Sequence, residues 1–154
     1  MDTVAVRGRQ VGPALVVAVA SIIAGGLVAA ATAQIPSERT SWATAYLVLV
    51  CGVGTLGLAL GRAFLSPGRP SDIALAGEFG TWILGNALVL VGTLAELTWL
   101  LDLGGLLLVV ALALVVVRIR RGPGPRWVRA GFTSLVVLLL VSVPVGLALA
   151  RLRD

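Results

Sequence analysis

The stretch PALVVAVASIIAGGLVAAATA, Pro13 to Ala33, runs for 21 residues without a charged side chain. As a helix, a run of this length crosses the hydrocarbon core of a bilayer. Four further apolar runs follow, separated by short polar segments. With 58% apolar residues and a mean hydropathy of +1.05, the chain would expose far more apolar surface in water than a soluble domain carries. The sequence therefore predicts an all-α integral membrane protein.

The apolar runs predict one domain over residues 1–154, a bundle of five transmembrane helices. The expected spans are about 13–34, 42–62, 79–96, 97–118 and 130–150. The first is expected to open at Pro13, because a helix tolerates a missing amide in its first turn. Ala31-Thr32-Ala33 before Gln34 also has the form of a signal-peptide cleavage site, so removal of the first run is the alternative.

The stretch from Phe79 to Val117 must fold back, because a helix of its 39 residues would cross the bilayer almost twice. Glu96, Asp102 and Gly104-Gly105 mark the expected bend. The fourth span starts at either Leu97 or Leu103. The Leu97 start is favoured, because it gives 21 residues rather than 15.

The joints between the spans have their own polar and aromatic patterns. Trp42 opens the second run and, with Tyr46, is expected to anchor it at the membrane interface. Residues 62–78 predict a loop and a short surface helix, with Ser71-Asp72 as the N-cap. Pro144 is expected to kink the last helix, and Cys51 to be a small packing residue.

The arginines predict a cytoplasmic N-terminus. Five spans place nine of the 12 basic residues on the inner side and three outside, in agreement with the positive-inside rule. The inner set comprises Arg7, Arg9, Arg62, Arg69, Arg118, Arg120, Arg121, Arg126 and Arg129; the outer set comprises Arg39, Arg151 and Arg153. The expected location is the plasma membrane, as a multi-pass protein of a bacterium with a GC-rich genome.

Missing residue types exclude several kinds of chemistry. The chain has neither lysine nor histidine, so it cannot form a lysine Schiff base, ligate haem or zinc through histidine, or use a histidine base. Its single cysteine excludes an internal disulfide and a multi-cysteine metal site. We therefore expect no enzyme activity, no cofactor and no metal. A nucleic-acid role is not expected, because no recognition motif accompanies the positive charge.

Small residues recur at four-residue spacing in the first two spans. Such residues let helix backbones approach closely in a bilayer. The expected helix-packing positions are Ser21, Gly25, Ala29, Gly57 and Gly61. Packing within the chain is favoured over docking on a partner, because such spacings arise often in a sequence rich in glycine and alanine.

Three polar residues are candidates for a path across the membrane. Asn86 lies near the middle of the third span, and Glu96 and Asp102 lie at the expected bend. Together they predict a route for a cation or proton. The favoured interpretation of Asn86 is an interhelical hydrogen bond, and that of the two acids a solvated turn. Glu78, at the start of the third span, is expected to interact with the helix dipole.

The segment before the last span is the strongest local charge signal. It contains five arginines and a tryptophan and predicts contact with anionic lipid headgroups or with an acidic partner. The residues are Arg118, Arg120, Arg121, Arg126, Trp127 and Arg129.

Two functions remain. The favoured one is a structural or accessory subunit that packs against a larger membrane protein, whereas assembly of the chain with itself favours the alternative. The alternative is a small oligomeric transporter or channel with a polar path near Asn86, Glu96 and Asp102. The first is preferred, because transport sites usually need more polarity inside the membrane than one amide and two marginal acids.

Overall fold

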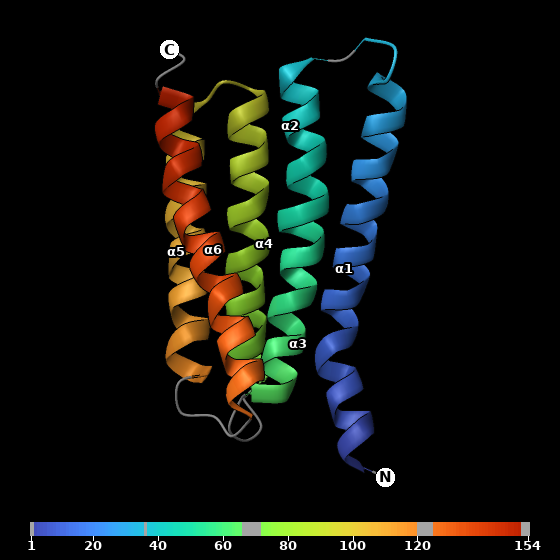
Figure 1. The fold of residues 1–154 in the computed structure, drawn as a ribbon, viewed down its shortest axis with the longest axis vertical. Helices are drawn as coiled ribbons and strands as arrows, with labels where there is room; N and C mark the ends of the chain where they lie inside the picture. Colours follow the sequence, from blue (N-terminus) through green and yellow to red (C-terminus); the bar gives the residue numbers. More distant parts are fainter. Residues whose placement is uncertain (1, 36, 66–71, 120–124, 152–154) are drawn as a thin grey trace. The chain divides into compact units, whose positions relative to one another are not determined.

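The computed structural model describes residues 2–35, 37–65, 72–119 and 125–151, with side chains over 11–35, 37–65, 76–117 and 125–142. Within these residues the chain is helical and contains no strand (Figure 1). It divides into two compact units, residues 1–64 and 65–154, which are treated separately below. The predicted all-α fold is confirmed over the described residues.

The first unit consists of two long antiparallel helices (Figure 1). One is α1 (Asp2–Thr32). The other is continuous through α2 (Glu38–Tyr46), a π-helical segment η1 (Leu47–Gly54) and α3 (Thr55–Leu65). The predicted start of the first helix at Pro13 is wrong, since α1 already begins at Asp2 and Pro13 lies inside it.

The helix of the second span begins earlier than predicted, at Glu38 instead of Trp42, because Ser37 caps it. The Ser37 Oγ accepts a hydrogen bond from the Thr40 amide at 3.1 Å, and the Ser37 amide donates to the Thr40 Oγ1 at 3.1 Å. This reciprocal arrangement is a capping box, which satisfies amides that the first helical turn leaves unpaired.

Replacing the cap gives a first testable prediction. Ser37→Ala is expected to lower the free energy of unfolding in detergent by about 1 kcal/mol, because the Thr40 amide loses its acceptor. Ser41→Ala is the matched control, since Ser41 is an exposed serine one turn further along the same helix. Equal losses in the two variants would contradict the importance of the cap.

Helix α1 packs against α2 and η1 through small residues. Ala14, Ala18 and Gly25 are buried along one side of α1. A Cβ on Gly25 would lie 2.6 Å from the Val48 Cγ2 and 3.2 Å from the Thr44 carbonyl oxygen. Glycine therefore lets the two backbones approach closely, with dispersion in place of a hydrophobic driving force.

The second helix also contributes small residues to this interface. A Cβ on Gly52, in η1, would lie 2.5 Å from the Ile22 Cγ1. Cys51 beside it is buried, as expected for a small packing residue. The π-helical segment thus lies at the contact with α1, and such segments are rare in helices.

The second unit contains α4 (Asp72–Leu94), α5 (Thr98–Ile119) and α6 (Arg126–Arg151). Helices α4 and α5 form an antiparallel hairpin, and α6 packs against α5 (Figure 1). The predicted short surface helix before Phe79 is not separate, because one continuous helix starts at Asp72. The predicted cap at Ser71 lies outside the described residues.

The predicted bend is confirmed at Glu96. Its φ of 58° is left-handed, and the Leu97 amide donates to the Gly92 carbonyl oxygen at 2.8 Å. This pattern ends a helix by satisfying carbonyl groups of its last turn, usually with glycine at the left-handed position. Helix α5 starts at Thr98, one residue after the favoured start at Leu97 and well before the alternative start at Leu103.

Gly104 does not mark the bend, which corrects the prediction, because α5 continues through Gly104-Gly105. A Cβ on Gly104 would lie 2.7 Å from the Val89 amide nitrogen and 2.8 Å from the Gly85 carbonyl oxygen. A Cβ on Gly92 would lie 2.6 Å from the Leu101 amide nitrogen. The glycines are thus packing positions at which α4 and α5 meet backbone to backbone.

Four helices of the described part are long and apolar enough to cross a membrane. They cover Val11–Thr32, Glu38–Leu65, Ala76–Leu94 and Thr98–Val117. They correspond to the first four predicted spans. The fifth, residues 130–150, lies within helix α6. The side chain of Pro144, where a kink was predicted, lies outside those described.

Candidate functional site: a buried polar stripe on α4

Three side chains able to form polar interactions lie one above another on α4. Glu78, Trp82 and Asn86 are separated by four residues each, so they share one side of the helix. All three are buried, with exposed fractions of 5%, 4% and 4%. Glu78 and Asn86 lie within the candidate span Ala76–Leu94, where burial of an acid or amide is costly and often marks a functional position.

Asn86 is held by its own helix. Its Nδ2 donates a hydrogen bond to the Trp82 carbonyl oxygen at 2.8 Å. Thr81 and Thr93 act in the same way, donating to the Gly77 and Val89 carbonyl oxygens at 2.8 Å. Such bonds to the preceding turn let polar side chains exist in an apolar setting without a second helix. Asn86 also has an interaction beyond this bond.

Glu78 is the functional candidate that sequence reasoning undervalued. Because α4 starts at Asp72, Glu78 lies about 9 Å along the axis from the first residue, beyond the first turn where the helix dipole acts. The predicted dipole role is therefore not supported. Glu78 has an interaction with another group of the structure, so its buried carboxylate is not isolated. Its spacing to Trp82 and Asn86 was the signal that could have revealed it.

The predicted polar path is spread along the hairpin of α4 and α5. Glu96 lies exposed in the turn, and Asp102 lies half-buried in the second turn of α5. Asn86 lies eight residues before the end of α4, about 12 Å along the axis. The turn therefore brings the two acids to the same end of the hairpin, and Asn86 lies deeper, about two turns from Glu78 in the stripe.

The predicted helix-packing residues have different surroundings. In α1, Gly25 is buried and Ser21 is half-buried, whereas Ala29 is exposed. Gly57 is half-buried and Gly61 buried in α3. Next to Gly25, Gly26 is exposed and a Cβ there would meet nothing within 4 Å.

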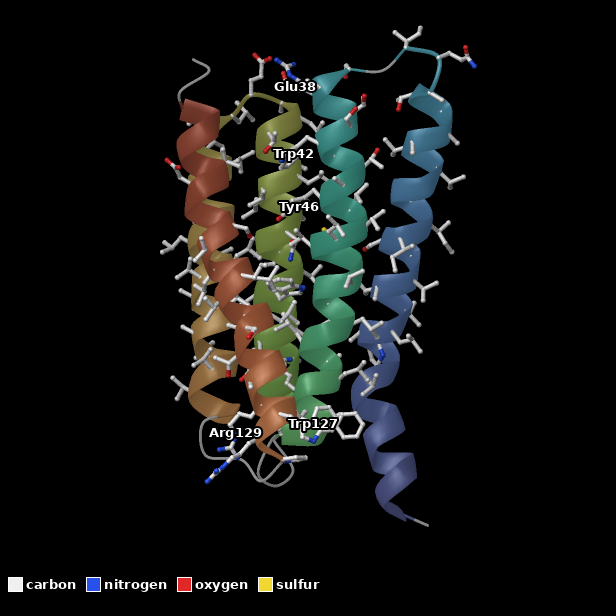
Figure 2. All side chains as sticks on the ribbon, in the orientation of Figure 1. Glu38, Trp42, Tyr46, Trp127 and Arg129 are labelled. Atoms are coloured by element: carbon white, nitrogen blue, oxygen red, sulfur yellow. The ribbon has the colours of Figure 1, made fainter. Side chains whose placement is uncertain are left out.

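The arginine-rich segment is described in part. Arg126 and Trp127 are exposed and Arg129 is half-buried, all within the first turn of α6. Figure 2 shows Trp127 and Arg129 at the end where the chain enters this helix. Arg118 lies in the last turn of α5, and its side chain is not among those described. Arg120 and Arg121 lie outside the described residues.

The predicted interfacial aromatics form a pair on α2. The rings of Trp42 and Tyr46 stack with centroids 5.0 Å apart and planes 20° apart (Figure 2). Both side chains are half-buried, one and two turns after Glu38. Stacking of this kind adds to the stability of adjacent turns.

Among the described residues, no group of three or more acidic, cysteine or histidine side chains could hold a metal ion. Comparison with protein-family models, curated proteins and solved structures found no match. Three features of the described residues bear on function: the stripe on α4, the exposed side of α1 and the cationic start of α6.

Proposed function

We propose that this chain is a five-span plasma-membrane protein with a cytoplasmic N-terminus, and that it acts as a structural or accessory subunit of a larger membrane assembly. The observation that carries the proposal is the open side of α1. Only 17% of its apolar window is buried, against 33–39% in the other three candidate spans. The first helix thus offers the most surface to a partner.

The open side of α1 has the chemistry of a helix contact. Ile23 and Leu27 are 56% and 65% exposed. Between them and beyond them lie Gly26, Ala29 and Ala30, all exposed and all small. Small residues let a second helix approach closely, and the larger apolar ones supply dispersion contacts at its margins.

Adjacent glycines make this proposal testable. Gly26→Leu combined with Ala30→Leu is expected to reduce co-purification of a partner from mild detergent by tenfold or more, because two added side chains separate the helices. The chain's own unfolding free energy should stay unchanged or rise by up to about 1 kcal/mol, since a Cβ at Gly26 meets nothing and leucine is the better helix former.

Gly25→Leu is the control for folding, because it is expected to destabilise the chain by disturbing its contact with Val48 and Thr44. The proposal is supported if a partner that co-purifies with the unchanged protein, identified by mass spectrometry, is lost when Gly26→Leu and Ala30→Leu are combined. A chain that purifies alone, or a Gly26 variant that keeps every partner, contradicts it.

The transporter alternative is favoured by a different observation, the burial of Glu78 and Asn86 on one side of α4. These residues supply more polarity inside the candidate span than the sequence suggested. Purified protein in liposomes, assayed for proton and monovalent-cation flux under an imposed gradient, distinguishes the two functions. Flux above that of empty liposomes supports transport.

A further inference from the structure

The exposed side of α6 combines a charge, an aromatic ring and small residues in a fixed order. Arg126 is exposed, and Trp127 is 78% exposed. One and two turns further into the helix, Ala130 and Ser134 are exposed and small. We call Arg126, Trp127, Ala130 and Ser134 the α6 headgroup face. Helical spacing places Ala130 and Ser134 directly along the axis from the first two residues.

The charge at this end of α6 opposes the helix dipole. A basic residue at a helix N-terminus is disfavoured by the helix dipole, and the first turn of α6 contains no acidic residue. No acidic residue occurs anywhere between Asp102 and Asp154 in the sequence. Arg126 is exposed and so presents a positive charge that an external anion can neutralise.

The rest of the face fits a lipid molecule. An exposed tryptophan at the end of an apolar helix is typical of the level of the lipid glycerol and carbonyl groups. Further along the helix, Ala130 and Ser134 form a strip of small exposed residues, and Val137 and Leu138 continue this side as exposed apolar surface. Charge, ring and apolar strip thus occur in the order of phosphate, glycerol and acyl chain.

We propose that the α6 headgroup face binds an anionic phospholipid, with its phosphate at Arg126, its glycerol region at Trp127 and one acyl chain along Ala130 and Ser134. The inference requires α6 to span the membrane, but it requires no protein partner and goes beyond the subunit role. Each arginine at an anionic surface contributes enough to change binding about fivefold. Arg129 is half-buried and has interactions within the structure, so Arg126 carries the assignment.

The test is titration of the detergent-solubilised full chain with fluorescent phosphatidylglycerol and, separately, fluorescent phosphatidylcholine. Phosphatidylglycerol is expected to bind more tightly. Arg126→Gln should weaken its binding about fivefold, and Ala130→Leu should also weaken it by filling the strip beside the acyl chain. Arg39→Gln is the matched control, because Arg39 is another exposed arginine in the first turn of a helix.

The possible results separate the sources of the signal. Loss in the Arg126 and Ala130 variants, with no change in the Arg39 variant, supports the site. Equal affinity for the two lipids, or equal loss in the Arg39 and Arg126 variants, overturns it. Competition by inorganic phosphate at the same concentration as the lipid, with no effect of Ala130→Leu, also overturns it in favour of a simple anion site. Circular dichroism of each variant confirms that the helices remain intact.

Discussion

Gly104→Ala is expected to lower the free energy of unfolding by about 2 kcal/mol, although alanine is the better helix former. The added methyl carbon would lie 2.7 Å from the Val89 amide nitrogen and 2.8 Å from the Gly85 carbonyl oxygen. Both are backbone atoms of α4, which cannot rotate away as a side chain would. The hairpin of α4 and α5 must therefore open to accept a single carbon. Unfolding of the purified protein in a dodecyl sulfate titration, followed by circular dichroism, measures the loss.

Gly80→Ala provides the control for that measurement. Gly80 lies in α4, is exposed, and has nothing within 4 Å of an added Cβ. The same substitution there is expected to be neutral or stabilising by up to about 1 kcal/mol, because only helix propensity changes. If both variants have the same stability, close backbone packing does not hold the hairpin together.

Glu78→Leu is expected to cost about 3 kcal/mol of unfolding free energy, despite replacing an acid with an apolar side chain inside a candidate span. Glu78 is 5% exposed and interacts with another group of the structure. Removing one member of a buried polar interaction leaves the other desolvated and without compensation. Glu78→Gln should recover part of the loss, since an amide still accepts a hydrogen bond. The same dodecyl sulfate titration serves as the assay.

Glu38→Leu is the comparison for Glu78, because it removes a carboxylate that is exposed in the first turn of α2. Its expected cost is below about 1 kcal/mol, from the lost interaction with the helix dipole. A Glu78→Leu variant as stable as the unchanged chain would show that the carboxylate is tolerated rather than required.

Sequence reasoning recovered the helical fold and the turn at Glu96, but it misplaced where helices begin. A span predicted by counting uncharged residues ends at the first charged residue. The hydrogen-bonded helix extends past that residue, as far as a capping residue. The helix at Glu38 begins with the cap of Ser37, and α4 passes through Glu78 without interruption. Charges inside a helix were therefore assigned to loops.

The same rule concealed the candidate site. Glu78 is the last charged residue before an apolar run, so counting uncharged residues hides its alignment with Trp82 and Asn86 on one side of the helix. Gly104 resembles a turn residue in the sequence because glycine is common in turns, whereas in the structure it lies at a contact between helices. Only coordinates distinguish the two roles, because both require the absence of a side chain.

If α4 and α5 span a membrane, the short turn at Glu96 affects how they enter it. Three residues, Ala95 to Leu97, join α4 to α5. Because only three residues join these helices and their backbones are in contact, we expect them to leave the insertion machinery together. They would enter the lipid as a pair, and two antiparallel spans return the chain to the side of the membrane on which the first span began. The segments before α4 and after α5 would thus lie on the same side of the membrane even if the orientation of the whole protein were inverted.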